Sequence, residues 1–146
     1  VCYLELGREN TRVVGGIAVV VFEPYRKWMM ELELNNEYVT EVPTTYTAQA
    51  FITTDTDNNQ ITAFHPGAMD FSNTNDLKSI RGADIGIISP DGKEGMLNHA
   101  RQLADLKIPF IFDPGQGMPM FDGDELTQLI KLADWVSVNE YESKKL

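Results

Sequence analysis

The sequence predicts an α/β fold, in which a parallel sheet is flanked by helices and a small β-hairpin is set apart from the sheet. Two observations carry this prediction. After residue 84, short apolar segments alternate with longer amphipathic segments, a pattern typical of strands and helices in turn. Before it, residues 46–64 hold two runs of β-branched and aromatic residues around a polar turn, as in a hairpin.

The first forty residues predict a strand, a helix and a second strand. Residues 13–22 form the longest apolar run and indicate a buried strand, although Gly15 and Gly16 weaken it. Pro24 suits the first turn of a helix predicted over residues 25–34, whose apolar face would include Trp28 as a core residue. Residues 38–42 predict a short strand that ends at Pro43.

The hairpin prediction rests on residues 46–54 and 60–64, which flank the turn sequence Asp-Thr-Asp-Asn-Asn. Alternation places Gln49 and Phe51 on one face of the hairpin, and Ala50 and Ile52 on the other. Neither face is uniformly polar. We therefore expect the hairpin to contact other structure on both sides.

The remaining chain predicts three strand–helix units. The strands are expected at residues 84–89, 108–112 and 135–138, and the helices at 92–106, 123–133 and from 140 onward. Two helix starts carry an acidic residue with a glutamate three positions later, which predicts capping boxes at Asp91–Glu94 and Asp122–Glu125. Trp135 lies in an apolar pattern and is expected in the core.

Composition excludes several classes of function. The formal net charge of −10 disfavours nucleic acid as a partner, because an acidic surface repels phosphate backbones. The longest apolar run is too short to span a bilayer, so no membrane contact is expected. Two histidines and one cysteine cannot form a common zinc site. The single cysteine, Cys2, cannot form an internal disulfide, which suits a cytoplasmic protein.

Three stretches resemble the PfkB carbohydrate-kinase family, whose fold is called ribokinase-like, and in particular its adenosine-kinase branch. Residues 47–69, Thr-Ala-Gln-Ala-Phe-Ile-Thr-Thr-Asp and onward to His-Pro-Gly-Ala-Met, are similar to the lid region of bacterial members. Residues 112–115, Phe-Asp-Pro-Gly, resemble the Asp-Pro strand end of the family. Residues 139–142, Asn-Glu-Tyr-Glu, resemble its Asn-x-x-Glu motif.

The resemblance implies a partial ribokinase-like domain over residues 1–146, with lid-forming strands over 38–65 and the βα repeats of the core over 84–146. Family members are about twice this length. The glycine- and asparagine-rich substrate motif expected near the start is not recognisable in residues 1–21. The Gly-Ala-Gly-Asp-type motif, which would supply the catalytic aspartate, does not occur in the 146 residues. We therefore expect no catalytic base in this chain, and little or no activity from it alone.

The resemblance also assigns roles to individual residues. Asn139 and Asp113 would contact phosphate groups of ATP, and Glu142 would orient water bound to Mg²⁺. Gln49 and Phe51 would face the substrate from the lid. Taken without the resemblance, Asn139 and Glu142 equally suit a helix N-cap and its capping-box partner, Asp113 suits a turn before a proline, and the lid residues suit ordinary strand packing or a dimer contact.

The expected function is therefore part of an ATP- and Mg²⁺-dependent kinase, a transferase that phosphorylates a primary hydroxyl of a nucleoside, adenosine above all, or of a sugar. One alternative within the family is a sugar kinase for ribose or fructose. An alternative of another class is a non-catalytic ligand-binding or assembly domain, which the altered N-terminal region supports. The exposed edge of the hairpin also offers a route to a homodimer through the lid.

Overall fold

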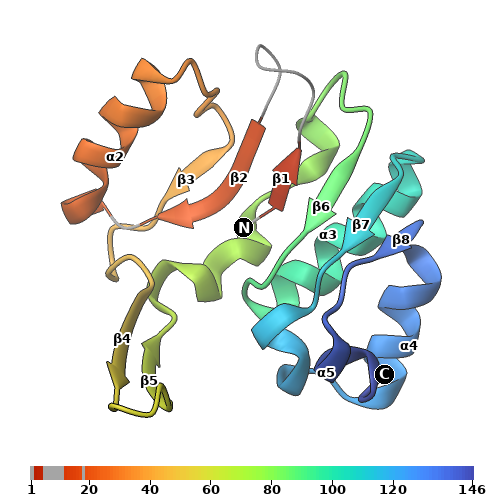
Figure 1. Cartoon of the computed structure of the whole chain (residues 1–146). Coiled ribbons are helices and arrows are strands. Elements are labelled where there is room, and N and C mark those ends of the chain that lie inside the picture. The colour runs from red at the N-terminus through yellow and green to blue at the C-terminus, as the bar shows by residue number, and fades with distance from the viewer. Residues whose placement is uncertain (1, 5–11, 18) are drawn as a thin grey trace.

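The structure, a computed structural model, describes residues 2–4, 12–17 and 19–146, with side chains from residue 23 on. A sheet of six strands organises this part of the chain (Figure 1). The strand order is β3-β2-β1-β6-β7-β8, and a separate pair, β4-β5, forms a second sheet. The six strands are β1 (Cys2–Leu4), β2 (Arg12–Ile17), β3 (Val39–Glu41), β6 (Gly86–Ile88), β7 (Phe110–Phe112) and β8 (Trp135–Val136).

The parallel sheet predicted from the βα alternation is confirmed for β6, β7 and β8, which pair in parallel. β2 and β3 are also parallel, but β1 runs antiparallel to both of its neighbours, β2 and β6. A short connection can join antiparallel neighbours, whereas parallel strands need a longer crossover. β1 is therefore the strand that runs against the other five of this sheet.

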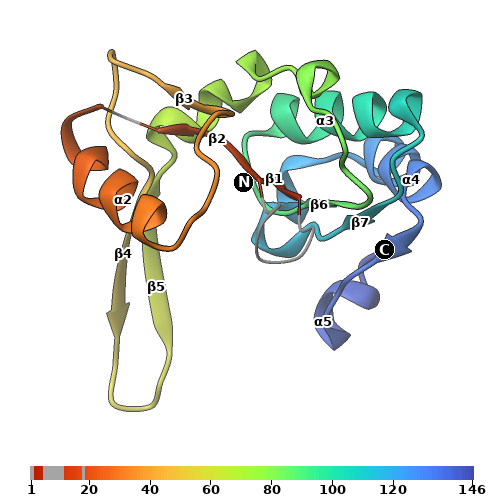
Figure 2. The same ribbon diagram turned by 90° about the horizontal axis from the view of Figure 1, so that it is seen from above.

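Helices cover the sheet on the side that carries the core. Figure 2 shows α3 and α4 on one side of β6 and β7, with α5 on the other. The helices are α2 (Val19–Glu31), α3 (Lys93–Leu106), α4 (Gly123–Leu132) and the short α5 (Glu140–Ser143), with 3₁₀ turns η1 (Gly67–Thr74), η2 (Leu77–Ser79) and η3 (Gly115–Met120). No helix in the described ranges is both long enough and apolar enough to cross a bilayer.

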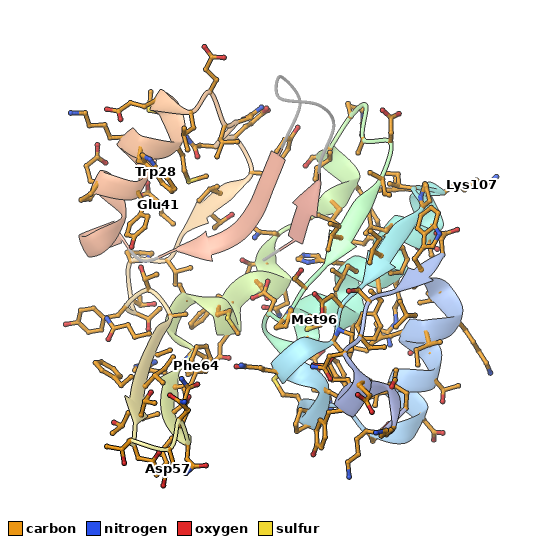
Figure 3. All side chains as sticks on the ribbon, viewed as in Figure 1. Trp28, Glu41, Asp57, Phe64, Met96 and Lys107 are labelled. Atoms are coloured by element: carbon orange, nitrogen blue, oxygen red, sulfur yellow. The ribbon has the colours of Figure 1, made fainter. Side chains whose placement is uncertain are left out.

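The core lies between β6–β7 and the α3–α4 pair. Phe110 and Phe112 of β7 are fully buried, and Phe112 meets the ring of Phe121 edge-on, with ring centres 6.5 Å apart. Met96 of α3, which Figure 3 places near the centre of the molecule, and Leu129 of α4 close the layer from the helix side. Burial of such large apolar side chains is the main stabilising contribution to this half of the chain.

The predicted hairpin is confirmed as β4 (Gln49–Thr54) paired antiparallel with β5 (Gln60–His65). In the turn, the Asp55 carboxylate accepts hydrogen bonds from the Asn59 side chain at 2.9 Å and from the backbone N–H groups of Asn59 at 2.9 Å and Asp57 at 2.8 Å. These hydrogen bonds lower the pKa of Asp55. The expectation of contacts on both faces is wrong, because every residue of both strands is exposed.

The N-terminal helix starts earlier than predicted. The apolar run expected as one strand over residues 13–22 divides into β2 and the first turn of α2, with Ala18 outside the described residues. Pro24 therefore lies inside α2 rather than at its start. Proline has no backbone N–H, so the second turn of α2 lacks one intrahelical hydrogen bond at this position.

Both tryptophans expected in the core are exposed, Trp28 by 56% and Trp135 by 53%. Trp28 lies on α2 (Figure 3), and Trp135 lies on β8, the last strand of the sheet. Apolar periodicity identifies the face that a side chain occupies, but it does not supply the layer that would cover that face.

Of the two capping boxes predicted for the long helices, one is confirmed. At α4, Glu125 N–H donates to Asp122 at 2.8 Å and the Glu125 carboxylate accepts from Asp122 N–H at 2.9 Å. The box at Asp91–Glu94 is wrong, because Gly92 occupies the N-cap of α3. Asp91 is buried one residue earlier, where its carboxylate accepts from Gly92 N–H.

Candidate functional site

The carboxyl ends of β7 and β8 bring the three predicted phosphate- and metal-binding residues to one edge of the sheet. Asp113 directly follows β7, and its backbone N–H donates to Ile88 O of β6 at 2.8 Å. Ser137 N–H donates to Phe112 O at 2.9 Å and carries the chain past the end of β8 toward Asn139. In open α/β sheets this is the edge at which ligands bind.

Asp113 is held in a tight turn beside Pro90. Gly115, two residues later, has φ = +43°, and a side chain there would meet Pro90 Cγ at 2.8 Å and the Asp113 carboxylate at 3.3 Å. Glycine is therefore required at this position. Partial burial and the nearby Glu142 carboxylate raise the pKa of Asp113, while a hydrogen bond from Gly115 N–H opposes the rise. Asp113 thus sits beside a second negative charge.

Asn139 and Glu142 form a complete capping box at the start of α5. Glu142 N–H donates to Asn139 Oδ1 at 2.9 Å, and Asn139 N–H donates to Glu142 Oε2 at 2.9 Å. The Asn139 side-chain amide also donates to Glu142 Oε1 at 2.8 Å. The helix-cap interpretation of this motif therefore describes the geometry. Each carboxylate oxygen of Glu142 accepts one hydrogen bond and keeps further lone-pair capacity.

A groove of about 540 Å³ opens beside Glu142, between η3 and α5. Its walls are mostly apolar, with Glu142 and Lys145 as the charged groups. Sequence analysis assigned a role to Glu142 alone among the residues of this groove, because its walls come from separate segments that only the fold brings together. The lining residues are Gly115, Gln116, Met118, Pro119, Leu126, Tyr141, Glu142 and Lys145.

Gln49 and Phe51 lie apart from this cluster. Both are on β4, where they pair with His65 and Ala63 of β5, and Phe51 is 64% exposed. Figures 1 and 2 show the β4–β5 hairpin projecting from the body at one end and α5 at the other. The structure therefore brings Asp113, Asn139 and Glu142 together, and leaves the two lid residues on a separate arm.

The hairpin joins the body through a constrained base. Gly67 has φ = +53°, and a side chain there would lie 2.1 Å from Tyr46 O. Ala68 N–H donates to the same Tyr46 oxygen at 2.8 Å, and the His65 ring nitrogen Nδ1 accepts from Gly67 N–H at 3.0 Å. His65 therefore has a structural role at the base of the arm.

Several solved structures are similar to this fold. A nucleoside kinase of Burkholderia thailandensis in complex with inosine superposes with a TM-score of 0.87 and 50% identity, over 92% of this chain and 44% of that one. A nucleoside kinase of Methanocaldococcus jannaschii, an archaeal member of the ribokinase family, gives 0.79 at 23% identity, over 94% and 46%. A ribokinase of Thermotoga maritima gives 0.71 at 21% identity, over 90% and 42%. No family model matches the chain.

The chain thus has a ribokinase-like fold, with a parallel βα core and a projecting β arm, and it spans less than half the length of the kinases it matches. The predicted resemblance is confirmed: the chain is similar to members of the ribokinase-like family, and at 50% identity to a nucleoside kinase.

Proposed function

We propose that this chain is part of an ATP-dependent kinase that phosphorylates a primary hydroxyl of a purine nucleoside, adenosine or inosine. One observation carries the proposal: the 50% identity that extends over 92% of the chain to a nucleoside kinase in complex with inosine. The same kinase in complex with ADP-inosine supports the use of an adenine nucleotide as the second ligand. The ribokinases among the neighbours, at 21% identity or less, carry the fold alone.

Asp113, Asn139 and Glu142 would form the phosphate-facing edge of this kinase. The fit to Mg²⁺ rests on the carboxylates of Asp113 and Glu142. Burial and, after it, the charge of Glu142 raise the pKa of Asp113, and a divalent cation would relieve the repulsion between the two carboxylates. The described residues contain no group of three or more potential protein ligands. Mg²⁺ suits such a sparse site, because it usually keeps several waters and binds one or two carboxylates together with substrate phosphates.

When bound, Mg²⁺ would neutralise charge on the phosphoryl group that is transferred. The residues of this chain would position the hydrated ion and the phosphate groups. Glu142 would orient a water of the hydrated ion, and Asn139, held by the capping box, would fix the Glu142 carboxylate. Asp113 would lie next to the phosphates at the end of β7. The family resemblance implies that the catalytic base belongs to a Gly-Ala-Gly-Asp-type motif, which the 146 residues lack, so we expect the chain by itself to show little or no turnover.

The β4–β5 arm would act as a lid. Phe51 offers an exposed aromatic surface to a base or sugar, and Gln49 on the same face offers an amide for hydrogen bonding. A lid that covers the substrate excludes water and so limits hydrolysis of ATP. The same exposed edge could pair two copies. A strict monomer in size-exclusion chromatography at high protein concentration would contradict pairing through the lid.

The test measures phosphorylation directly. The complete kinase that contains these residues is assayed for ADP formation with adenosine, inosine, ribose and fructose, and the 146-residue chain is assayed in parallel. We expect turnover with a purine nucleoside from the complete protein only. Turnover with ribose or fructose alone would favour the sugar-kinase alternative. Absence of turnover with every acceptor would favour a non-catalytic binding domain.

A matched pair of variants tests the metal role of Glu142. Glutamine at this position still completes a capping box, so Glu142→Gln should keep α5 while removing the charge. We expect weaker Mg²⁺-dependent binding of ADP to the chain, measured by calorimetry. Glu140→Gln, two residues away and exposed, is the control and should leave binding unchanged. Equal binding by both variants would show that Glu142 only caps the helix.

A further inference from the structure

A second cleft lies at the opposite edge of the sheet from Asp113 and Glu142. It has a volume of about 190 Å³ and is formed where the chain enters β3 and where η1 passes into η2. β3 runs in the same direction as β7, so the start of β3 is at the amino edge of the sheet. The lining residues are Glu37, Tyr38, Thr40, Thr74, Asn75, Asp76, Ser79 and Ile80.

The hydroxyl groups of three residues in this cleft donate hydrogen bonds to acceptors within the protein. Thr74 Oγ1 donates to Phe71 O at 2.7 Å, and Ser79 Oγ donates to Asp76 O at 3.0 Å. Thr40 Oγ1 donates to the Asn75 side-chain oxygen. A hydroxyl that has donated its proton can only accept. The Thr74 and Ser79 hydroxyls therefore face a ligand as acceptors, and so does Thr40 in this orientation of the Asn75 amide.

Two carboxylates add to this excess of acceptors. Glu37 and Asp76 line the cleft and are exposed, and no basic side chain stands among the residues that form its walls. One Asp76 oxygen accepts from Lys78 N–H at 3.0 Å as the cap of η2, and the other keeps its full capacity.

Asn75 gives independent evidence that something polar belongs here. Asn75 is 7% exposed, and its amide nitrogen Nδ2 is buried without a hydrogen-bond partner among the residues that the structure describes. Turning the amide over would pair Nδ2 with Thr40 and leave the oxygen unpaired instead, so one polar atom lacks a partner in either orientation. Buried polar atoms are nearly always satisfied, by protein, water or ligand.

From this arrangement we propose that the cleft is a binding site for a small primary ammonium ion that also carries a hydroxyl group. The ammonium group would donate to Glu37, Asp76 and the hydroxyl oxygens, and the hydroxyl of the ligand would pair with the Asn75 amide. A metal ion suits the cleft less well, because only two carboxylates line it. The site is independent of the proposed kinase activity, since it lies at the other edge of the sheet.

The test titrates the 146-residue chain with 2-hydroxyethylammonium chloride and follows amide signals by NMR. We expect saturable shifts at residues 37–40 and 74–80, including the Asn75 side-chain amide. Sodium chloride at equal ionic strength and ethylene glycol, which lacks the charge, should not reproduce them. Shifts of the same size with either control, or no saturable shift at all, would mean that the cleft holds only water or loosely held ions.

Two charge-neutral variants locate the site. Glu37→Gln removes an exposed carboxylate, and Asp76→Asn removes a charge while asparagine keeps the cap of η2. Each should weaken binding about tenfold, the effect of losing one charge-assisted hydrogen bond. Glu31→Gln, an exposed acid on α2 away from the cleft, controls for the net charge of −10 and should bind as the parent chain does. Equal loss in all three variants would overturn the proposal, since it would point to nonspecific attraction.

Discussion

The substitution Gly95→Ala tests how η1, and with it the hairpin arm, is anchored to the core. A β-carbon on Gly95 of α3 would lie 2.0 Å from Ser72 Oγ and 2.9 Å from Ser72 Cβ. Ser72 is fully buried in η1, the segment that follows the arm. Because neither backbone can move without disturbing the other, the added methyl group must displace one of the two elements.

The expected change in the free energy of unfolding is the sum of two opposing contributions. Overpacking a close contact costs about 1–3 kcal/mol. Replacing glycine by alanine inside a helix returns about 0.8–1.0 kcal/mol through helix propensity. Gly123→Ala is the matched control, because Gly123 opens α4 with nothing within 4 Å of its added β-carbon. The control therefore reports the conformational contribution without the clash.

Urea unfolding followed by circular dichroism measures both variants. We expect Gly95→Ala to lower the free energy of unfolding, and Gly123→Ala to leave it unchanged or raise it slightly. Each kcal/mol should move the melting temperature by about 2–4 °C in a chain of this size. Ser72→Gly removes the opposing atoms, so the double variant should recover stability relative to Gly95→Ala alone. Equal stability of Gly95→Ala and Gly123→Ala would refute the close contact.

Three further predictions concern buried groups. Burial lowers the pKa of His99 below its ordinary value of 6.5. The contribution of His99 to stability is therefore present above pH 6.5 and is lost as the pH falls. His99→Gln should make the urea midpoint change less between pH 7.5 and 5.5 than it does in the parent chain. The raised pKa of Asp113 means that its ionised carboxylate destabilises the folded state near pH 7. Asp113→Asn should therefore raise the urea midpoint at pH 7 but not below pH 3.8. A gain that persists below pH 3.8 would show that the carboxylate charge is not its cause. Phe112→Ala should cost about 3–5 kcal/mol in unfolding free energy, whereas an exposed aromatic such as Phe51 should cost far less when replaced by alanine.

Several features of the chain followed from sequence because they depend on near neighbours. The capping boxes at Asp122 and Asn139 join residues three positions apart, and the turn at Asp55 is closed by its own side chain. The alternation of apolar segments likewise identified β6, β7 and β8 as parallel strands. The same local pattern failed at Asp91, where burial beneath α3 overrode the capping signal.

Other features were decided only when distant segments met. The charge of Glu142 acts on Asp113 because adjacent strands β7 and β8 end at one edge of the sheet. The acceptor-rich cleft arises because the approach to β3 lies against Asn75 and its neighbours, although no motif links them in sequence. The sequence alone determines which faces of an element are apolar and where tight turns form, since these features depend on residues that are near one another along the chain. Contacts across the sheet depend on how whole elements pack, and only the tertiary structure determines them.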